Sequence, residues 1–125
     1  MKLRNILSLL LLTLILSTPA MAAGVKQIGI KELHTLTEAS KGKVLIINYW
    51  ATWCGPCVQE FPGLVALRNQ FSEDDLTIIG ISVDNNVRPV ENFITRYKAN
   101  FPIYLDNQEI CQRSEERRVG KECRS

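Results

Sequence analysis

The sequence is poor in the side chains that most often bind metal ions. It has one histidine, His34, and two methionines, Met1 and Met21, which both lie near the N-terminus. A structural zinc site usually needs four cysteine or histidine ligands, and thioether sulfurs favour copper. His34 stands alone in a segment with a helical pattern, so we expect a surface or packing residue there. We expect neither a resident metal ion nor another cofactor.

A strong excess of one charge is also missing. The formal net charge is +2 over 125 residues, and the basic excess lies at the two ends of the chain. Between them, residues 23–112 carry eight basic and ten acidic side chains. Nucleic-acid binding usually needs clustered lysine and arginine, so we expect no nucleic-acid partner.

The most apolar stretch is too short to span a bilayer, which takes about 20 residues. It is "ILSLLLLTLIL", residues 6–16, preceded by the basic "MKLRN" and followed by "STPAMA". A basic start, a short apolar core and a small-x-small end at Ala20-Met21-Ala22 are typical of a secretory signal peptide. We therefore predict a signal peptide over residues 1–22 and export to the periplasm. An uncleaved signal would instead tether the domain to the outer face of the inner membrane.

The last thirteen residues, "RSEERRVGKECRS", differ in composition from everything before them. Residues 113–123 match, without a gap, the translation of a common sequencing adapter. We interpret residues 113–125 as a non-native tail and exclude them from the fold prediction. The domain would then cover residues 23–112 and be truncated near Gln112.

Between these ends, apolar runs alternate with segments of helical period. The buried-strand runs are residues 44–50, 76–83 and 101–106, and the helical segments are residues 30–43, 56–71 and 84–100. Alternating strands and helices predict an α/β fold with a mostly parallel sheet flanked by helices. The run at 44–50 is continuously apolar, which predicts a central strand buried on both faces. Pro62 should kink the helix in which it lies.

Two cysteines follow that strand in the stretch "WATWCGPCVQE". The pattern places Cys54 at the N-terminal end of a helix and Cys57 one turn further in. Unpaired N–H groups and the helix dipole at that end lower the pKa of a cysteine thiol. Pro56 is tolerated there because the first turn leaves N–H groups unpaired in any case. A loop of this size constrains an unfolded chain little, so the pair is a poor structural staple and a good redox couple.

The stretch "NYWATWCGPCVQEFPGL", with "GKVLIINYWATWC" leading into it, resembles the thioredoxin superfamily. It is most similar to the exported TlpA/ResA-like thiol–disulfide oxidoreductases, over about residues 25–112. The resemblance implies a thioredoxin-like fold that is incomplete at its C-terminus. The family's cis-proline loop, closing hairpin and last helix would be missing, so we expect the 125-residue chain to be unstable and weakly active.

The resemblance also implies roles for residues around the pair. Cytosolic thioredoxins have a buried aspartate where this chain has Asn48, and the TlpA/ResA-like branch often has a glutamate where this chain has Glu60. Cys54 would attack a partner disulfide, and Cys57 would then resolve the mixed disulfide. Glu60, three residues beyond Cys57, would accept the proton of Cys57, or else be a solvated helix residue. Trp53, with Gly55 and Pro56, would face the partner.

The partner implied is an exported protein disulfide, for example that of an apocytochrome c. The Gly-Pro dipeptide is similar to that of thioredoxin, whose couple lies near about −270 mV, so a reductant is favoured over an oxidant. A reductant outside the cytoplasm needs a membrane electron donor. The alternative is a thioredoxin-like module that binds copper or zinc without redox turnover.

Three further residues have plain structural interpretations. Trp50 is expected to pack at the end of its strand, and Asp84 to be a turn residue after the next strand. Cys111 is expected to be an ordinary thiol.

Overall fold

The computed structural model describes residues 24–116, with the side chains of residues 24–113. The predicted signal peptide and most of the predicted tail lie outside this part. The elements in chain order are β1 (Lys26–Ile28), α2 (Ile30–Ala39), β2 (Val44–Trp50), α3 (Gly55–Gln70), β3 (Leu76–Ser82), α4 (Val87–Tyr97), β4 (Ile103–Asp106) and α5 (Glu109–Glu116).

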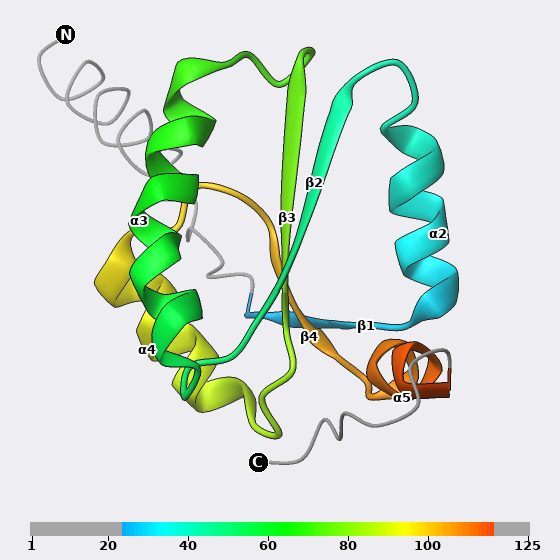
Figure 1. Ribbon diagram of the computed structural model, residues 1–125, viewed down its shortest axis with the longest axis vertical. Coiled ribbons are helices and arrows are strands. Elements are labelled where there is room, and N and C mark those ends of the chain that lie inside the picture. Colours follow the sequence, from blue (N-terminus) through cyan, green and yellow to red (C-terminus); the bar gives the residue numbers. More distant parts are fainter. Residues whose placement is uncertain (1–23, 117–125) are drawn as a thin grey trace, which may run out of the picture.

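The four strands form one parallel sheet in the order β1-β4-β3-β2. Helices α3 and α4 cover one face of this sheet, and α2 and α5 lie on the other (Figure 1). The predicted α/β class, with a parallel sheet flanked by helices, is confirmed. Because neighbouring parallel strands run in the same direction, the carboxyl ends of β2 and β3 meet at one edge of the sheet.

Each face of the sheet has its own hydrophobic core. Side chains alternate along a strand, so neighbours in β3 enter different cores: Ile78 packs with Phe61 on the α3 side and Ile79 with Ile28 on the α2 side. The α3 side holds most of the aromatic rings, and Phe61 is fully buried at its centre. This larger core supports the helix that carries the two cysteines.

The prediction that residues 44–50 form a central strand is wrong. Among the described strands β2 is at the edge of the sheet and pairs only with β3. Its side chains are mostly half-buried, and Val44 is 63% exposed. A continuous apolar run tells a strand apart from a surface loop, but it does not tell an edge strand from a central one.

Two elements escaped prediction. β1 has only three residues, of which one is buried, so it shows no usable alternation. Helix α5 crosses residue 113, where the predicted tail begins. The buried carboxylate of Asp106 accepts hydrogen bonds from the backbone N–H groups of Ile110, at 3.3 Å, and Cys111, at 2.9 Å, and so caps its first turn.

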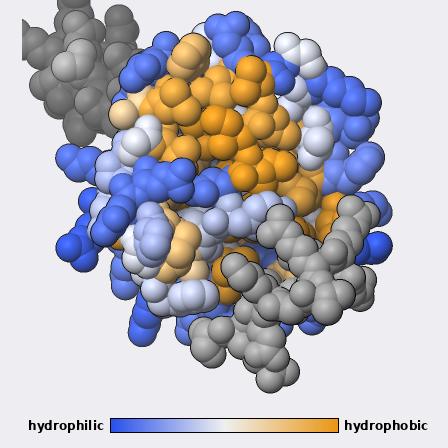
Figure 2. Space-filling model, in the orientation of Figure 1, coloured by the Kyte–Doolittle hydropathy of each residue, from blue (hydrophilic) through white to orange (hydrophobic). Residues whose placement is uncertain are grey.

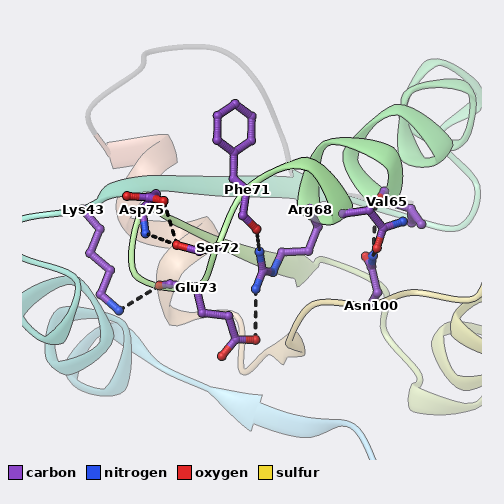
Figure 3. Close-up of polar contacts among 9 residues, drawn as sticks. Lys43, Val65, Arg68, Phe71, Ser72, Glu73, Asp75 and Asn100 are labelled. Atoms are coloured by element: carbon purple, nitrogen blue, oxygen red, sulfur yellow. Dashed lines mark hydrogen bonds and ion pairs between the residues drawn. The ribbon is translucent and has the colours of Figure 1, made fainter.

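Helix α3 continues through Pro62, and side chains join its far end to the loop that precedes β3 (Figure 3). Arg68 donates to the carbonyl of Phe71 at 2.8 Å and pairs with the carboxylate of Glu73 at 3.0 Å. Lys43 donates to the backbone carbonyl of Glu73 at 2.9 Å. These contacts hold the loop between α3 and β3, at the end of the helix remote from Cys54.

Candidate active site

The loop between β2 and α3 places both cysteines at the start of a helix. Strand β2 ends at Trp50, Cys54 is the N-cap residue of α3, and Pro56 lies in the first turn. The Cys54 N–H donates to the carbonyl of Ala51 at 3.1 Å, and the Cys54 carbonyl accepts from the N–H of Val58 at 3.0 Å. The predicted strand-to-helix position of Cys54 is therefore confirmed.

The two sulfurs are joined in a disulfide. The S–S distance is 2.07 Å and the two Cα atoms are 5.3 Å apart. Both residues are half-buried, and Cys57 also packs against the core on the α3 side. The arrangement is the oxidised form of a dithiol pair that a second thiol can reach from solvent.

The surroundings of Cys54 favour a thiolate in the reduced form. A helix N-terminus presents unpaired N–H groups and the positive end of the helix dipole. The first turn of α3 contains no acidic residue that would oppose this field. The geometry therefore provides the conditions under which a cysteine becomes a nucleophile near neutral pH.

Trp50 anchors the strand end beneath the cysteines. Its side chain is 2% exposed, and its ring centroid lies 4.5 Å from that of Phe93 and 5.2 Å from that of Phe61. The predicted packing role of Trp50 is confirmed. Its indole N–H is buried and has no hydrogen-bond partner among the described residues.

Trp53, Gly55 and Pro56 form the outer surface beside the disulfide. Trp53 is 57% exposed, and the other two are also exposed. An exposed indole next to the disulfide offers a partner both an apolar ring and an N–H donor. Their position is compatible with the predicted partner-facing role, which stays a prediction.

The two residues that the resemblance linked to proton transfer lie on different elements. Asn48, which is half-buried, projects from β2 on the same side as Trp50, toward α3. Glu60 is exposed on α3, three residues beyond Cys57 and on the same side of the helix. No hydrogen bond or ion pair joins Glu60 to another residue in the described part of the chain, and its role in proton transfer stays a prediction.

Asp84 is more than the turn residue that the sequence suggested. Its carboxylate is buried, at 7% exposure, and accepts hydrogen bonds from the backbone N–H and the hydroxyl of Thr52, in the cysteine loop. The signal was present in the sequence. Asp84 follows one strand and Thr52 follows another, and adjacent parallel strands end at the same edge.

Three further titratable residues, His34, Tyr49 and Cys111, lie on α2, β2 and α5. His34 is exposed on α2, as predicted for a surface residue. Burial, and then the charge of Asp106, raise the pKa of Tyr49 above its ordinary value.

The expectation that Cys111 is an ordinary thiol is wrong, because Cys111 is disulfide-bonded. Within residues 24–116, no group of three or more histidine, cysteine or acidic side chains is placed to hold a metal ion.

Comparison with known proteins agrees with this site. Residues 18–116 match the model of the AhpC/TSA family. The chain is 38% identical over 66 residues to the thiol-disulfide oxidoreductase ResA of Bacillus subtilis (strain 168), which covers 53% of this chain and 37% of that protein. The predicted resemblance to ResA-like proteins is confirmed. The chain spans about two fifths of the length of the ResA proteins it matches, 37% of the one from Bacillus subtilis and 43% of the one from Bacillus cereus (strain ZK / E33L).

Solved structures share the same architecture. The thioredoxin domain of a thiol-disulfide oxidoreductase from Bacteroides vulgatus superposes with a TM-score of 0.59 at 24% identity, over 68% of this chain and 61% of that one. A thiol:disulfide interchange protein of the thioredoxin family from Chlorobium tepidum TLS gives a TM-score of 0.56 at 29% identity, over 61% of this chain and 52% of that one. The thioredoxin-like fold is confirmed.

Proposed function

The chain belongs to the AhpC/TSA family, and from this premise we propose that it is a thiol–disulfide oxidoreductase that reduces disulfides in exported proteins. The observation that supports this most is the Cys54–Cys57 disulfide at the exposed N-terminus of α3. A dithiol at that place combines a nucleophilic outer sulfur with a resolving sulfur one turn away.

The reaction consists of two thiol–disulfide exchanges. The Cys54 thiolate attacks one sulfur of the partner disulfide, forms a mixed disulfide and releases the other partner sulfur as a thiolate. The Cys57 thiolate then attacks the sulfur of Cys54, closes the Cys54–Cys57 disulfide and releases the second partner thiol. The partner gains two electrons and the pair loses two, so the disulfide form described here is the product of one turnover.

Cys57 must lose a proton before the second exchange. We assign this proton to Glu60, which lies one helical turn beyond Cys57 and is exposed. Asn48 lies on the same side of the sheet as α3, but an amide does not accept a proton at neutral pH. Glu60 would take the proton directly or through a water molecule.

The partner and the location follow from the same proposal. None of the helices in the described residues is long and apolar enough to cross a membrane. The predicted signal, residues 1–22, lies outside them, and we propose that it directs the domain to the periplasm or tethers it to the inner membrane. An apocytochrome c is a suitable substrate there, and a membrane electron donor would return Cys54 and Cys57 to the dithiol.

Trapping of the mixed disulfide tests the proposal and the order of the cysteines together. Without Cys57 the second exchange cannot occur, so Cys57→Ser should accumulate a covalent adduct with a disulfide-containing protein such as insulin. Cys54→Ser should accumulate much less, because Cys57 is packed against the core. The adducts are counted on non-reducing gels and identified by mass spectrometry. Equal trapping by both variants would contradict the assignment of Cys54, and absence of any adduct with a reduced Cys57→Ser chain would overturn the function.

A further inference from the structure

Asp84 lies at the edge of the sheet where the neighbouring parallel strands β2 and β3 end. It follows β3 by two residues, and β2 ends beside it, since Trp50 is in register with Ser82. The Val83 N–H also donates to the Trp50 carbonyl at 2.9 Å, so the ladder extends to the edge of the cysteine loop. An acidic side chain at 7% exposure in this place requires compensation by hydrogen bonds.

Both carboxylate oxygens of Asp84 are occupied by neutral donors. Oδ2 accepts from the backbone N–H of Thr52 at 3.0 Å and from the hydroxyl of Ser82 at 2.6 Å. Oδ1 accepts from the hydroxyl of Thr52 at 2.6 Å. The Asp84 N–H donates to the Ser82 hydroxyl oxygen at 3.1 Å, so each of these two residues donates one hydrogen bond to the other. Bonds to a carboxylate are shorter and about twice as strong as those between neutral groups.

Two of these bonds hold the loop that carries the reactive cysteine. Thr52 stands two residues before Cys54, and two residues span at most about 7 Å. Beyond Thr52 the loop is held again where Cys54 enters α3, by the bonds from Cys54 to Ala51 and from Val58 to Cys54. Trp53, between these two fixed points, is exposed and provides no anchor of its own.

We propose that Asp84 is a positioning residue for Cys54: its buried carboxylate clamps Thr52 to the end of β3 and so holds the Cys54 sulfur within reach of Cys57. The proposal rests on the redox function proposed for the same pair. Closure of the disulfide is an intramolecular reaction, and its equilibrium depends on how well the two thiols are oriented in the reduced form. Release of the clamp lets Cys54 move away and makes the disulfide easier to reduce.

The clamp can be opened at Thr52 without changing a cysteine or a charge. Thr52→Val keeps the size of the side chain and the backbone bond to Asp84 but removes the hydroxyl donor, whereas Thr52→Ser keeps that donor. We expect Thr52→Val to lower the equilibrium constant for disulfide formation against glutathione about tenfold, which is about 30 mV in reduction potential. Thr52→Ser should stay within about twofold of the unsubstituted chain.

Substitutions of Asp84 separate its hydrogen bonds from its charge. Asp84→Asn retains an oxygen for the Thr52 N–H and the Ser82 hydroxyl, and its amide can donate to the Thr52 oxygen. It should therefore stay within about threefold of the unsubstituted chain, whereas Asp84→Ala should match or exceed the effect of Thr52→Val. If Asp84→Ala does not fold, the two Thr52 variants still decide the question.

The glutathione equilibrium is measured on the full chain, well below the unfolding midpoint of each variant. If the bonds between Asp84 and Thr52 only stabilised the fold, their loss would lower that midpoint and leave the equilibrium constant unchanged. Thr52→Val within twofold of the unsubstituted chain, or Thr52→Ser impaired as strongly as Thr52→Val, would overturn the proposal. The glutathione measurement needs no protein partner. A chain that equilibrates with glutathione but reduces no protein disulfide would therefore contradict the proposed function, while the Thr52 variants would still test the role of Asp84.

Discussion

Cys54 and Cys57 lie on the same turn of α3 but have different surroundings. Cys54 is the N-cap residue and adjoins the exposed Trp53, whereas Cys57 packs against the core on the α3 side. A sulfur at a helix end is favoured as a thiolate, and a sulfur against apolar side chains is disfavoured as one. As the proposed resolving cysteine, Cys57 therefore needs help in losing its proton, and among the described side chains on its own helix the nearest carboxylate in sequence is Glu60.

Replacement of Glu60 by glutamine tests this proton transfer. Loss of a general base should slow resolution of the mixed disulfide by up to about 100-fold, while the first attack by Cys54 changes much less. A small aromatic disulfide lets both steps be followed by absorbance, without a protein partner. Glu91→Gln, which removes an exposed carboxylate from α4, is the matched control and should change neither step. If Glu60→Gln and the unsubstituted chain resolve the mixed disulfide at the same rate at every pH from 6 to 8, Glu60 is a solvated surface residue.

At the scale of elements, β3 lies against Trp50 because one of its positions has no side chain. Gly80 is buried, and a Cβ atom built there would lie 3.2 Å from the indole nitrogen of Trp50 and 3.3 Å from side-chain carbons of Phe101 and Ile103. These distances are tighter than ordinary van der Waals contact. The absent side chain therefore leaves room for the Trp50 ring against β3.

Gly80→Ala should accordingly destabilise the fold. Overpacking of a well-filled core costs about 1–3 kcal/mol, and the lower entropy of the unfolded alanine chain returns about 0.4–1 kcal/mol. We expect a net loss of about 1–2 kcal/mol in the free energy of unfolding, measured by urea denaturation. Gly63→Ala is the control, because Gly63 lies within α3 with nothing within 4 Å of the added methyl group. That variant should gain up to about 1 kcal/mol, and a gain of the same size at Gly80 would show that the Trp50 ring is free to move.

The order of the longer elements could be predicted from local patterns, because β2 and β3 are continuous apolar runs and the helices around them repeat apolar residues at helical spacing. Residues 76–82 form β3 and residues 55–70 form α3, within one residue of the predicted ranges. The position of a strand within the sheet could not be predicted, since β2 has the composition of a buried strand but pairs on one side only. The short strand β1 gave too few residues for a pattern.

The part of the candidate site that lies within one short stretch of sequence could be predicted. The Cys-x-x-Cys spacing, the strand before it and the helix after it place Cys54 and Cys57 without any long-range information. Asp84 acts on Thr52 across 32 positions of sequence, and no local pattern reports such a contact. A search for polar residues at the carboxyl ends of neighbouring parallel strands would have selected it.

At the scale of the whole molecule, the two edges of the described sheet differ in character. The β1 edge carries Lys26 and the exposed Gln27. The β2 edge carries Val44, which is 63% exposed, and the half-buried Leu45, Ile46 and Ile47. The space-filling view shows an apolar surface in the upper middle, in the region where β2 lies between α2 and α3 (Figure 2). Edge strands are usually protected by charge, proline or a bulge.

Strand β2 has none of these protections within its seven residues, "VLIINYW". Lys43 precedes it, but its ammonium group is engaged with the backbone carbonyl of Glu73. We therefore expect the chain to self-associate at concentrations of tens of micromolar through this edge, since free backbone groups and apolar side chains together favour strand pairing.

A lysine at the most exposed position of β2 should suppress that association. Val44→Lys places a charge on the edge without disturbing either core, because Val44 is 63% exposed and belongs to neither cluster of buried residues. We expect the aggregated fraction to fall several-fold, with a change of less than about 0.5 kcal/mol in the free energy of unfolding, as is usual for surface substitutions. Light scattering coupled to size-exclusion chromatography measures the first quantity, and urea denaturation the second. Gln27→Lys adds the same charge to the opposite edge and should leave the aggregated fraction unchanged. Equal suppression by both variants would mean that net charge, and not the β2 edge, controls association.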